Sequence, residues 1–289
     1  MTTADLAVER HAAPYDADAV DAAARRDGAT ILESVFPASL ISKVNEEIDE
    51  YIACHPDEGL PTESDLYAEY LGLKTRRINA MIAKIASVPR LTSCEPVVDW
   101  ARRVMRPCAT SILLNTSELI EIQPGQQAQP LHRDSACWAH LGSVPGPVVI
   151  NAMIALTPFT EENGATSLAP GSFAWSADRM PHPYELTKAV MAIGDVLLFR
   201  GDLIHGAGAN TTVGERRRGA SMSYCAGWLR TVDNGVLVIP PERARELNPV
   251  NQELLGYSTY DGLSEGGGML GLTAGGDPRT VLEPGTGDG

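Results

Sequence analysis

The sequence predicts a mainly β protein with flanking helices. Helical patterns occupy the chain up to about residue 108, and short apolar or alternating runs separated by Gly-, Pro- and Asn-rich turns follow. Several short strands at this rhythm are typical of a β-sandwich or barrel. No internal repeat and no long linker divides the 289 residues, so we expect a single domain over residues 1–289.

The first part, about 15–108, is expected to be helical. Residues 16–27 are alanine-rich and are followed by Gly28, a residue that favours a helix end. Apolar residues between Leu40 and Ile52 recur at helical spacing after Pro37, which predicts an amphipathic helix. The elements expected here are a helix at 16–27, a strand at 29–36, and helices at 37–55, 76–86 and 90–106.

The central part, about 109–235, is expected to hold the β core, and the segment 236–289 is expected to be rich in loops. The glycine-rich chain after about 260 is expected to form a loop or a closing flap with a frayed end. The expected strand regions are 111–123, 147–159, 165–170, 188–200 and 218–230.

Charge and cysteine content limit the partners and the compartment. A net charge of −14 argues against nucleic acid or an anionic membrane as a partner. The five scattered cysteines show no CxxC spacing, which indicates a reducing compartment. The first 30 residues lack an apolar stretch typical of a signal peptide, and no run is long enough to span a membrane. We therefore expect a cytoplasmic protein.

Three side chains suggest a metal site. His132 and Asp134 are two residues apart, so in a strand they would point to the same face. By itself the pair is more typical of a solvated turn than of a metal site. His205 follows an apolar strand and precedes Gly206, and two imidazoles with one carboxylate are a ligand set for Fe(II). A hydrogen-bonded structural histidine is the alternative for His205.

Three consecutive arginines, Arg216 to Arg218, follow His205 in the sequence, and Arg217 is twelve residues after it. Alternation places Arg217 on the face opposite to Arg216 and Arg218, so one face would hold a ligand-binding arginine and the other would face water. A carboxylate would give an inward arginine a bidentate partner. Spacing alone leaves open which face is which.

The motifs HRD (132–134), ENGATSLAPGSF (162–173), GDVLLFRGDLIHGAGAN (194–210) and SYCAGWLR (223–230), taken in order, resemble the phytanoyl-CoA dioxygenase family of Fe(II)/2-oxoglutarate-dependent dioxygenases, most of all its natural-product branch. The resemblance covers roughly residues 25–260. It implies a double-stranded β-helix (jelly-roll, cupin-like) core. It also implies Fe(II) as cofactor, 2-oxoglutarate and O2 as cosubstrates, and ascorbate as a reductant. A homodimer is compatible with the resemblance.

The same resemblance implies the roles of particular residues. His132, Asp134 and His205 would bind the iron. Arg217, with Arg218 as the alternative, would bind the distal carboxylate of 2-oxoglutarate. Gln129 and Thr166 match positions that contact this cosubstrate. The aspartate at 134 argues against a halogenase, because halogenating relatives have a small residue there.

The segment 75–82 resembles a family segment near the site, which implies Arg76, Arg77, Asn79 and Met81 as candidates to contact substrate or cosubstrate; a solvated amphipathic helix is the alternative. Trp138 either lines the pocket or packs in the core. The low charge of these candidates favours a small, largely apolar substrate, and the lack of a dedicated basic cluster argues against an acyl-CoA.

The expected reaction is oxidation of that substrate, by hydroxylation or by desaturation or rearrangement, with release of succinate and CO2. Two other readings of the sequence remain. One is a cupin-like metal oxygenase that does not use 2-oxoglutarate, which would leave Arg217 unexplained. The other is a jelly-roll binding protein without catalysis.

Overall fold

Two β-sheets form the centre of the molecule. The computed structural model describes residues 6–61, 68–138, 140–142, 144–260 and 270–283. The larger sheet has the order β1-β2-β8-β5-β10-β4-β3, and the smaller has the order β7-β6-β9. The strands are β1 (Arg10–His11), β2 (Ala29–Leu32), β3 (Thr75–Ile78), β4 (Ile112–Ile122), β5 (Val149–Ala155), β6 (Thr166–Leu168), β7 (Thr187–Ala189), β8 (Val196–Arg200), β9 (His205–Gly206) and β10 (Arg217–Ala226).

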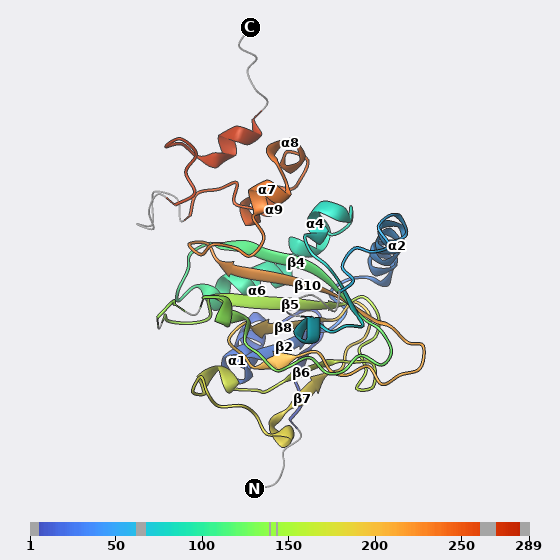
Figure 1. Cartoon of the computed structure of the whole chain (residues 1–289). Helices are drawn as coiled ribbons and strands as arrows, with labels where there is room; N and C mark the ends of the chain where they lie inside the picture. The colour runs from blue at the N-terminus through green and yellow to red at the C-terminus, as the bar shows by residue number, and fades with distance from the viewer. Residues whose placement is uncertain (1–5, 62–67, 139, 143, 261–269, 284–289) are drawn as a thin grey trace.

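Helices surround these sheets. In Figure 1 the C-terminal helices α7, α8 and α9 lie together at one end of the molecule, and β6 and β7 lie at the other. The helices are α1 (Ala17–Asp27), α2 (Ala38–Cys54), α3 (Ala68–Leu71), α4 (Met81–Lys84), α5 (Pro89–Thr92), α6 (Glu95–Met105), α7 (Gly235–Val238), α8 (Pro241–Ala244) and α9 (Pro249–Leu254). Short 3-10 turns are η1 (Asp134–Trp138), η2 (Ser172–Ala174), η3 (Pro183–Glu185) and η4 (Pro278–Leu282).

The alternation of residues in the central strands separates two cores. In β10, Ala220, Met222 and Tyr224 are buried against the helices. The opposite face of the larger sheet meets the smaller sheet in a second apolar cluster, to which β8 contributes Leu197 and Phe199. This arrangement of two facing sheets with outer helices is the double-stranded β-helix expected from the sequence.

Most elements expected in the N-terminal part are present. Helix α1 begins after Asp16, whose side chain accepts hydrogen bonds from two backbone N–H groups, and it ends at Gly28 with a φ of 80°. Helix α2 and strand β2 also lie within their expected ranges. Strand β1, which pairs in parallel with β2, was not expected.

The helix predicted over 76–86 is wrong in its first half. Thr75–Ile78 form β3, which pairs antiparallel with β4, and only Met81–Lys84 form the short helix α4. Ala80, with a φ of 54°, separates the two elements. Ile78 and Met81 still reach the same core, so apolar spacing alone could not distinguish a continuous helix from a strand followed by a helical turn.

One other boundary differs from expectation. The helix predicted over 90–106 is two helices, α5 and α6, and the second begins after Cys94 with a proline in its first turn. The segment 236–289, expected to be loop-rich, holds α8, α9 and η4 and most of α7. The closing flap expected after about 260 falls largely on 261–269 and 284–289, which lie outside the described residues.

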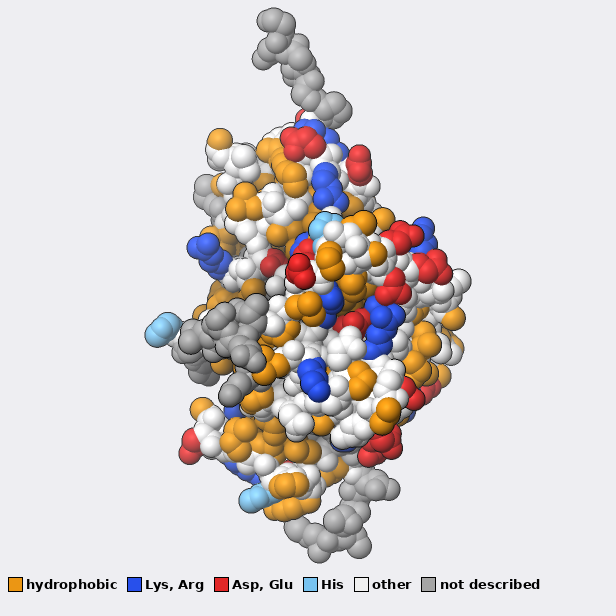
Figure 2. All heavy atoms as spheres, turned by 45° about the vertical axis from the view of Figure 1, so that its right-hand side comes forward, with side chains coloured by type: hydrophobic (Ala, Val, Ile, Leu, Met, Phe, Trp, Pro, Cys, Tyr) orange, Lys and Arg blue, Asp and Glu red, His pale blue; other side chains and the backbone are white. Residues whose placement is uncertain are grey.

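The surface carries mixed charge on the face shown in Figure 2, where acidic and basic side chains are interspersed. Among the helices of the described residues, none is long and apolar enough to cross a membrane.

Candidate active site

Three side chains converge between the sheets. One ligand atom each from His132, Asp134 and His205 lies within 4.8 Å of the other two. The Nε2 atom of His132 is 3.4 Å from Asp134 Oδ1, and the Nε2 atom of His205 is 3.5 Å from Asp134 Oδ2. Two imidazole nitrogens and a carboxylate that face one point form a facial ligand set, which suits Fe(II) and leaves other coordination positions open.

The backbone brings the three residues together in a different way from that expected. His132 and His205 pair through an isolated antiparallel bridge, with N···O distances of 2.9 and 3.0 Å in the two directions. Asp134 does not continue a strand but begins the 3-10 turn η1. The expectation that His132 and Asp134 share one face of a strand is therefore wrong. The bridge aligns the histidines, and the turn directs the carboxylate toward them.

Neighbouring groups orient the three candidate ligands. Nδ1 of His132 lies 3.0 Å from Pro130 O, and Nδ1 of His205 lies 3.0 Å from Leu203 O. A carbonyl acceptor at Nδ1 places the proton there and leaves the Nε2 lone pair for a metal. Asn151 donates from Nδ2 to Asp134 Oδ2 at 2.6 Å.

Electrostatics favour the forms of these groups that bind metals. Burial lowers the pKa of His205, against the opposing charge of Asp134. Burial raises the pKa of Asp134, but the two histidines and Asn151 outweigh it and lower this pKa to about 2. Metal ligands must be deprotonated, so the pocket holds a carboxylate and a neutral imidazole ready for a cation.

The cluster lies in a cavity of about 190 Å³. The larger sheet provides most of the wall, and η1, β6, β9 and four loop residues provide the rest. The lining residues are Arg77, Asn115, Thr116, Glu118, Ile120, Gln129, His132, Asp134, Cys137, Trp138, Asn151, Met153, Thr166, Phe199, His205, Ala207, Arg217, Ser221, Ser223 and Val232.

Arg217 reaches this cavity from β10 and is 1% exposed. Its Nη2 donates to Thr166 Oγ1 at 3.2 Å, and its Cζ lies 3.8 Å from the centre of the Phe159 ring. Nε and Nη1 are buried and have no hydrogen-bond partner among the described residues. Burial, with a smaller contribution from Arg77, lowers the pKa of Arg217 to about 9. A buried cation with free donors needs an anion, and a carboxylate matches its geometry.

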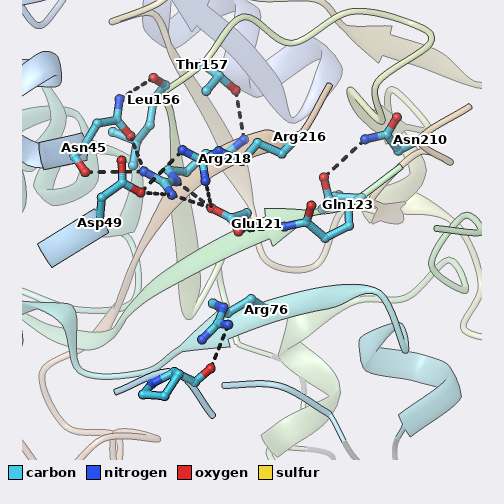
Figure 3. A network of polar contacts seen from close by, with 12 residues as sticks. Asn45, Asp49, Arg76, Glu121, Gln123, Leu156, Thr157, Asn210, Arg216 and Arg218 are labelled. Atoms are coloured by element: carbon cyan, nitrogen blue, oxygen red, sulfur yellow. Dashed lines mark hydrogen bonds and ion pairs between the residues drawn. The ribbon is translucent and has the colours of Figure 1, made fainter. Parts of the chain in front are cut away.

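Arg218 points to the opposite face of β10, where Figure 3 shows it inside a polar network. It donates to Glu121 Oε2 from Nη2 at 2.6 Å and from Nε at 2.8 Å. Asp49 and Asn45 of α2 accept further hydrogen bonds at 2.7 and 3.1 Å. The expectation that the face opposite Arg217 meets water is therefore wrong for Arg218, because helix α2 covers it.

The other candidates separate into two groups. Gln129, Thr166 and Trp138 line the cavity, and Gln129 Oε1 accepts a hydrogen bond from Ala207 N at 3.3 Å. Within the segment 75–82, Arg77 lines the cavity.

Three substrate candidates of the same segment do not line the cavity. Arg76 donates to the backbone of Pro56 and Glu58, and the backbone of Asn79 accepts from Lys84. Met81 is buried in the core beneath the helices. Because β3 is a strand, neighbouring residues point to opposite faces, which separates Arg76 from Arg77.

Sequence reasoning missed several residues at the site, among them Asn151, which holds the Asp134 carboxylate. Glu118 and Ser221 line the cavity from β4 and β10, and Tyr70 of α3 packs its ring edge-on against His132 with the centroids 5.1 Å apart. Glu118 had a signal, because it is an acid at an alternating position of an apolar strand. Tyr70 follows a polar, irregular segment and had none.

The ligand cluster and the unpaired arginine, placed in one cavity of a double-stranded β-helix, define a class: non-haem iron enzymes that use 2-oxoglutarate. The donor set fits the iron, and the free donors of Arg217 fit a cosubstrate carboxylate. The chain belongs to the phytanoyl-CoA dioxygenase (PhyH) family, whose model matches residues 24–219. It is an Fe(II)/2-oxoglutarate-dependent dioxygenase.

Known proteins support both the family and the fold. Dioxygenase olcK of Penicillium canescens is 30% identical over 81% of this chain and 78% of its own length. Dioxygenase FrzG of Cladobotryum sp. is 31% identical over 88% and 86% of the two chains. The epimerase SnoN, solved with Fe3+, alpha ketoglutarate and nogalamycin RO, shares the fold with a TM-score of 0.56 at 17% identity, over 73% of this chain and 84% of that chain.

Proposed function

We propose that this dioxygenase hydroxylates a small, largely apolar natural-product molecule, with conversion of 2-oxoglutarate to succinate and CO2. Desaturation or rearrangement of the substrate are alternative outcomes at the same site. The observation that carries the proposal is the presence of the three-residue ligand cluster and the unpaired donors of Arg217 in a single cavity. SnoN, which shares the fold, comes from nogalamycin biosynthesis, and a natural-product substrate is proposed for this chain by analogy.

Each residue has a role in this proposal. His132, Asp134 and His205 hold the iron, and Asn151 holds the Asp134 carboxylate in place. When bound, the iron and 2-oxoglutarate supply the oxidising chemistry with O2.

Arg217 fixes the distal carboxylate of 2-oxoglutarate, which orients the cosubstrate toward the ligand cluster. Thr166 holds the Arg217 guanidinium, and Gln129 lines the same cavity. Apolar groups of Met153 and Phe199 in the cavity wall exclude water from the reacting centre.

We also propose that residues 1–289 act as one domain, with the helical part, the β core and the C-terminal helices as its regions. Contacts that join these regions support this: α9 packs on β4, and Asn251 accepts a hydrogen bond from Thr92 at 2.7 Å.

The test measures succinate formed from 2-oxoglutarate by the protein supplied with Fe(II), O2 and ascorbate. We expect succinate from the wild type and none above background from the His132→Ala variant, whose iron content also falls. Oxidation of a substrate without any use of 2-oxoglutarate would instead support a cupin-like oxygenase. Unchanged iron content in His132→Ala, with no succinate from either protein, would support a binding protein without catalysis.

A further inference from the structure

The part of the cavity wall formed by β4 and β10 holds a polar pair that is separate from the candidate iron ligands and from Arg217. Glu118 of β4 and Ser221 of β10 are direct cross-strand partners, and both line the cavity. Antiparallel partners have Cβ atoms about 4.5–5.5 Å apart, so one chemical group can reach both side chains. Ser221 lies on the same face of β10 as Arg217 but four residues further along, or roughly 13 Å.

Both members of the pair have unused hydrogen-bonding capacity. Glu118 Oε2 accepts from Arg77 Nη1 at 3.1 Å. Among the described residues, neither Glu118 Oε1 nor Ser221 Oγ takes part in a hydrogen bond. The Glu118 side chain is 19% exposed, and the cavity is where it is accessible. Polar atoms in a closed site normally have a partner, so a ligand that enters the cavity has to supply one.

The charges around the cavity select against a charged ligand. Arg77 neutralises Glu118. In the loaded enzyme, the two positive charges of the iron and the charge of Arg217 balance Asp134 and the two carboxylates of 2-oxoglutarate, while the histidine ligands are neutral. Every charge of the lining residues then has a counter-charge. A charged substrate would bring an unpaired charge into a desolvated site, which is unfavourable.

Apolar side chains surround the polar pair. Ile120 and Met153 flank it on the sheet, and Trp138 and Val232 line other parts of the cavity. A ligand that fits has an apolar body that contacts these groups and one hydrogen-bonding group that reaches Glu118 and Ser221.

We propose that Glu118 and Ser221 form the substrate anchor, and that the anchor binds a hydroxyl or amide N–H of an uncharged substrate. Glu118 accepts the hydrogen bond through its free carboxylate oxygen. The Ser221 hydroxyl donates a hydrogen bond to the oxygen atom of the same substrate group. This inference rests on the proposed function and specifies the polar class of its substrate.

The first test uses four probes with one apolar skeleton. They are 1-adamantanol, adamantane-1-carboxamide, protonated 1-adamantanamine and adamantane-1-carboxylate. Calorimetry measures their binding to the wild type loaded with Fe(II) and saturating 2-oxoglutarate without O2. We expect the two uncharged probes to bind at least about tenfold more tightly than the two ions. Equal or tighter binding of either ion would overturn the proposal.

The second test changes the anchor. Glu118→Gln leaves Arg77 without its counter-charge, so the preference should reverse: the carboxamide binds about tenfold more weakly and the carboxylate more tightly than to the wild type. Ser221→Ala should weaken binding of the alcohol and the carboxamide about threefold to tenfold. A loss of stability alone would not produce this reversal.

Matched controls come from outside the cavity. Glu253 pairs with Arg102 at 3.1 Å, the same N···O distance as in the pair of Arg77 and Glu118. Glu253→Gln and Ser42→Ala should bind all four probes as the wild type does. The anchor is wrong if Glu118→Gln and Ser221→Ala also keep wild-type affinities, or if Glu118→Gln loses 2-oxoglutarate binding instead.

The proposed function and the anchor can fail separately. Absence of succinate formation by the wild type would contradict the proposed function. Probe binding to the protein loaded with Mn(II) in place of iron would still test the substrate anchor. Normal succinate formation with no preference for uncharged probes would leave the function intact and reject only the anchor.

Discussion

The guanidinium groups of Arg217 and Arg218 lie on opposite faces of β10, although the two residues are neighbours in the chain and each is 1% exposed. Arg217 has two donor atoms without a partner in the described structure, whereas Arg218 makes hydrogen bonds to three side chains of β4 and α2. Arg217 is therefore available to a ligand. Arg218 is held in the polar network shown in Figure 3.

Replacement of Arg217 by methionine should separate ligand binding from stability. The variant is expected to bind 2-oxoglutarate at least about 30-fold more weakly, because the partner of a desolvated carboxylate is lost. Without ligand, its thermal midpoint should be equal to or above that of the wild type, because an unpaired buried charge is removed. Calorimetry and thermal unfolding with and without 2-oxoglutarate measure both effects.

Arg217→Lys is the control, since it keeps the charge but loses the planar pair of donors. It should have an intermediate affinity. Wild-type affinity for 2-oxoglutarate in Arg217→Met would show that another group binds the distal carboxylate.

Disruption of the Arg218 network should affect the free energy of unfolding. Glu121→Gln removes the buried negative charge that pairs with Arg218 and is expected to cost about 3–5 kcal/mol, as breaking a buried ion pair does. Asp49→Asn removes a partner that is 51% exposed and should cost less than about 1 kcal/mol. Urea unfolding monitored by circular dichroism measures both values, and equal losses in the two variants would contradict the assignment of Glu121 as the main partner.

Loss of the Asn151 side chain should weaken iron binding although Asn151 is not itself a ligand. Its amide holds Asp134 at 2.6 Å, and loss of such an orienting group typically reduces metal affinity 10–100-fold. Asn151→Ala should show this loss in a titration with Fe(II) under anaerobic conditions. Asn115→Ala, a second cavity amide that bonds to Val232 N and Ser223, should keep wild-type iron affinity. Equal affinities in the two variants would argue against an orienting role for Asn151.

The stability of the metal-free protein should depend on Asp134 at low pH. Its pKa in the folded protein is lowered from 3.8 to about 2, so its stabilising contribution is complete above about pH 4 and is lost as the pH falls toward 2. Asp134→Asn cannot make this contribution. The urea midpoint should therefore decrease more between pH 5 and pH 2.5 in the wild type than in the variant. Equal decreases in the two proteins would refute the lowered pKa.

Local patterns in the sequence were sufficient for much of the fold. The helices α1 and α2 followed from their spacing and end signals, because those signals act within a few residues. The region of β3 was assigned wrongly, because its partner β4 lies about 40 residues away and pairing overrides apolar spacing. Arg76 and Met81, expected near the substrate from the family resemblance, lie outside the cavity, because the strand and the turn after it direct their side chains elsewhere.

The sequence by itself determined the candidate side chains of the site: two histidines, an aspartate and an arginine, in an order that resembles one enzyme family. Only the tertiary structure decided how they meet. The bridge between His132 and His205 and the turn at Asp134 depend on contacts between distant segments. The neighbours Glu118 and Ser221 likewise become a pair only through the register of β4 and β10, because cross-strand position is a property of the folded sheet.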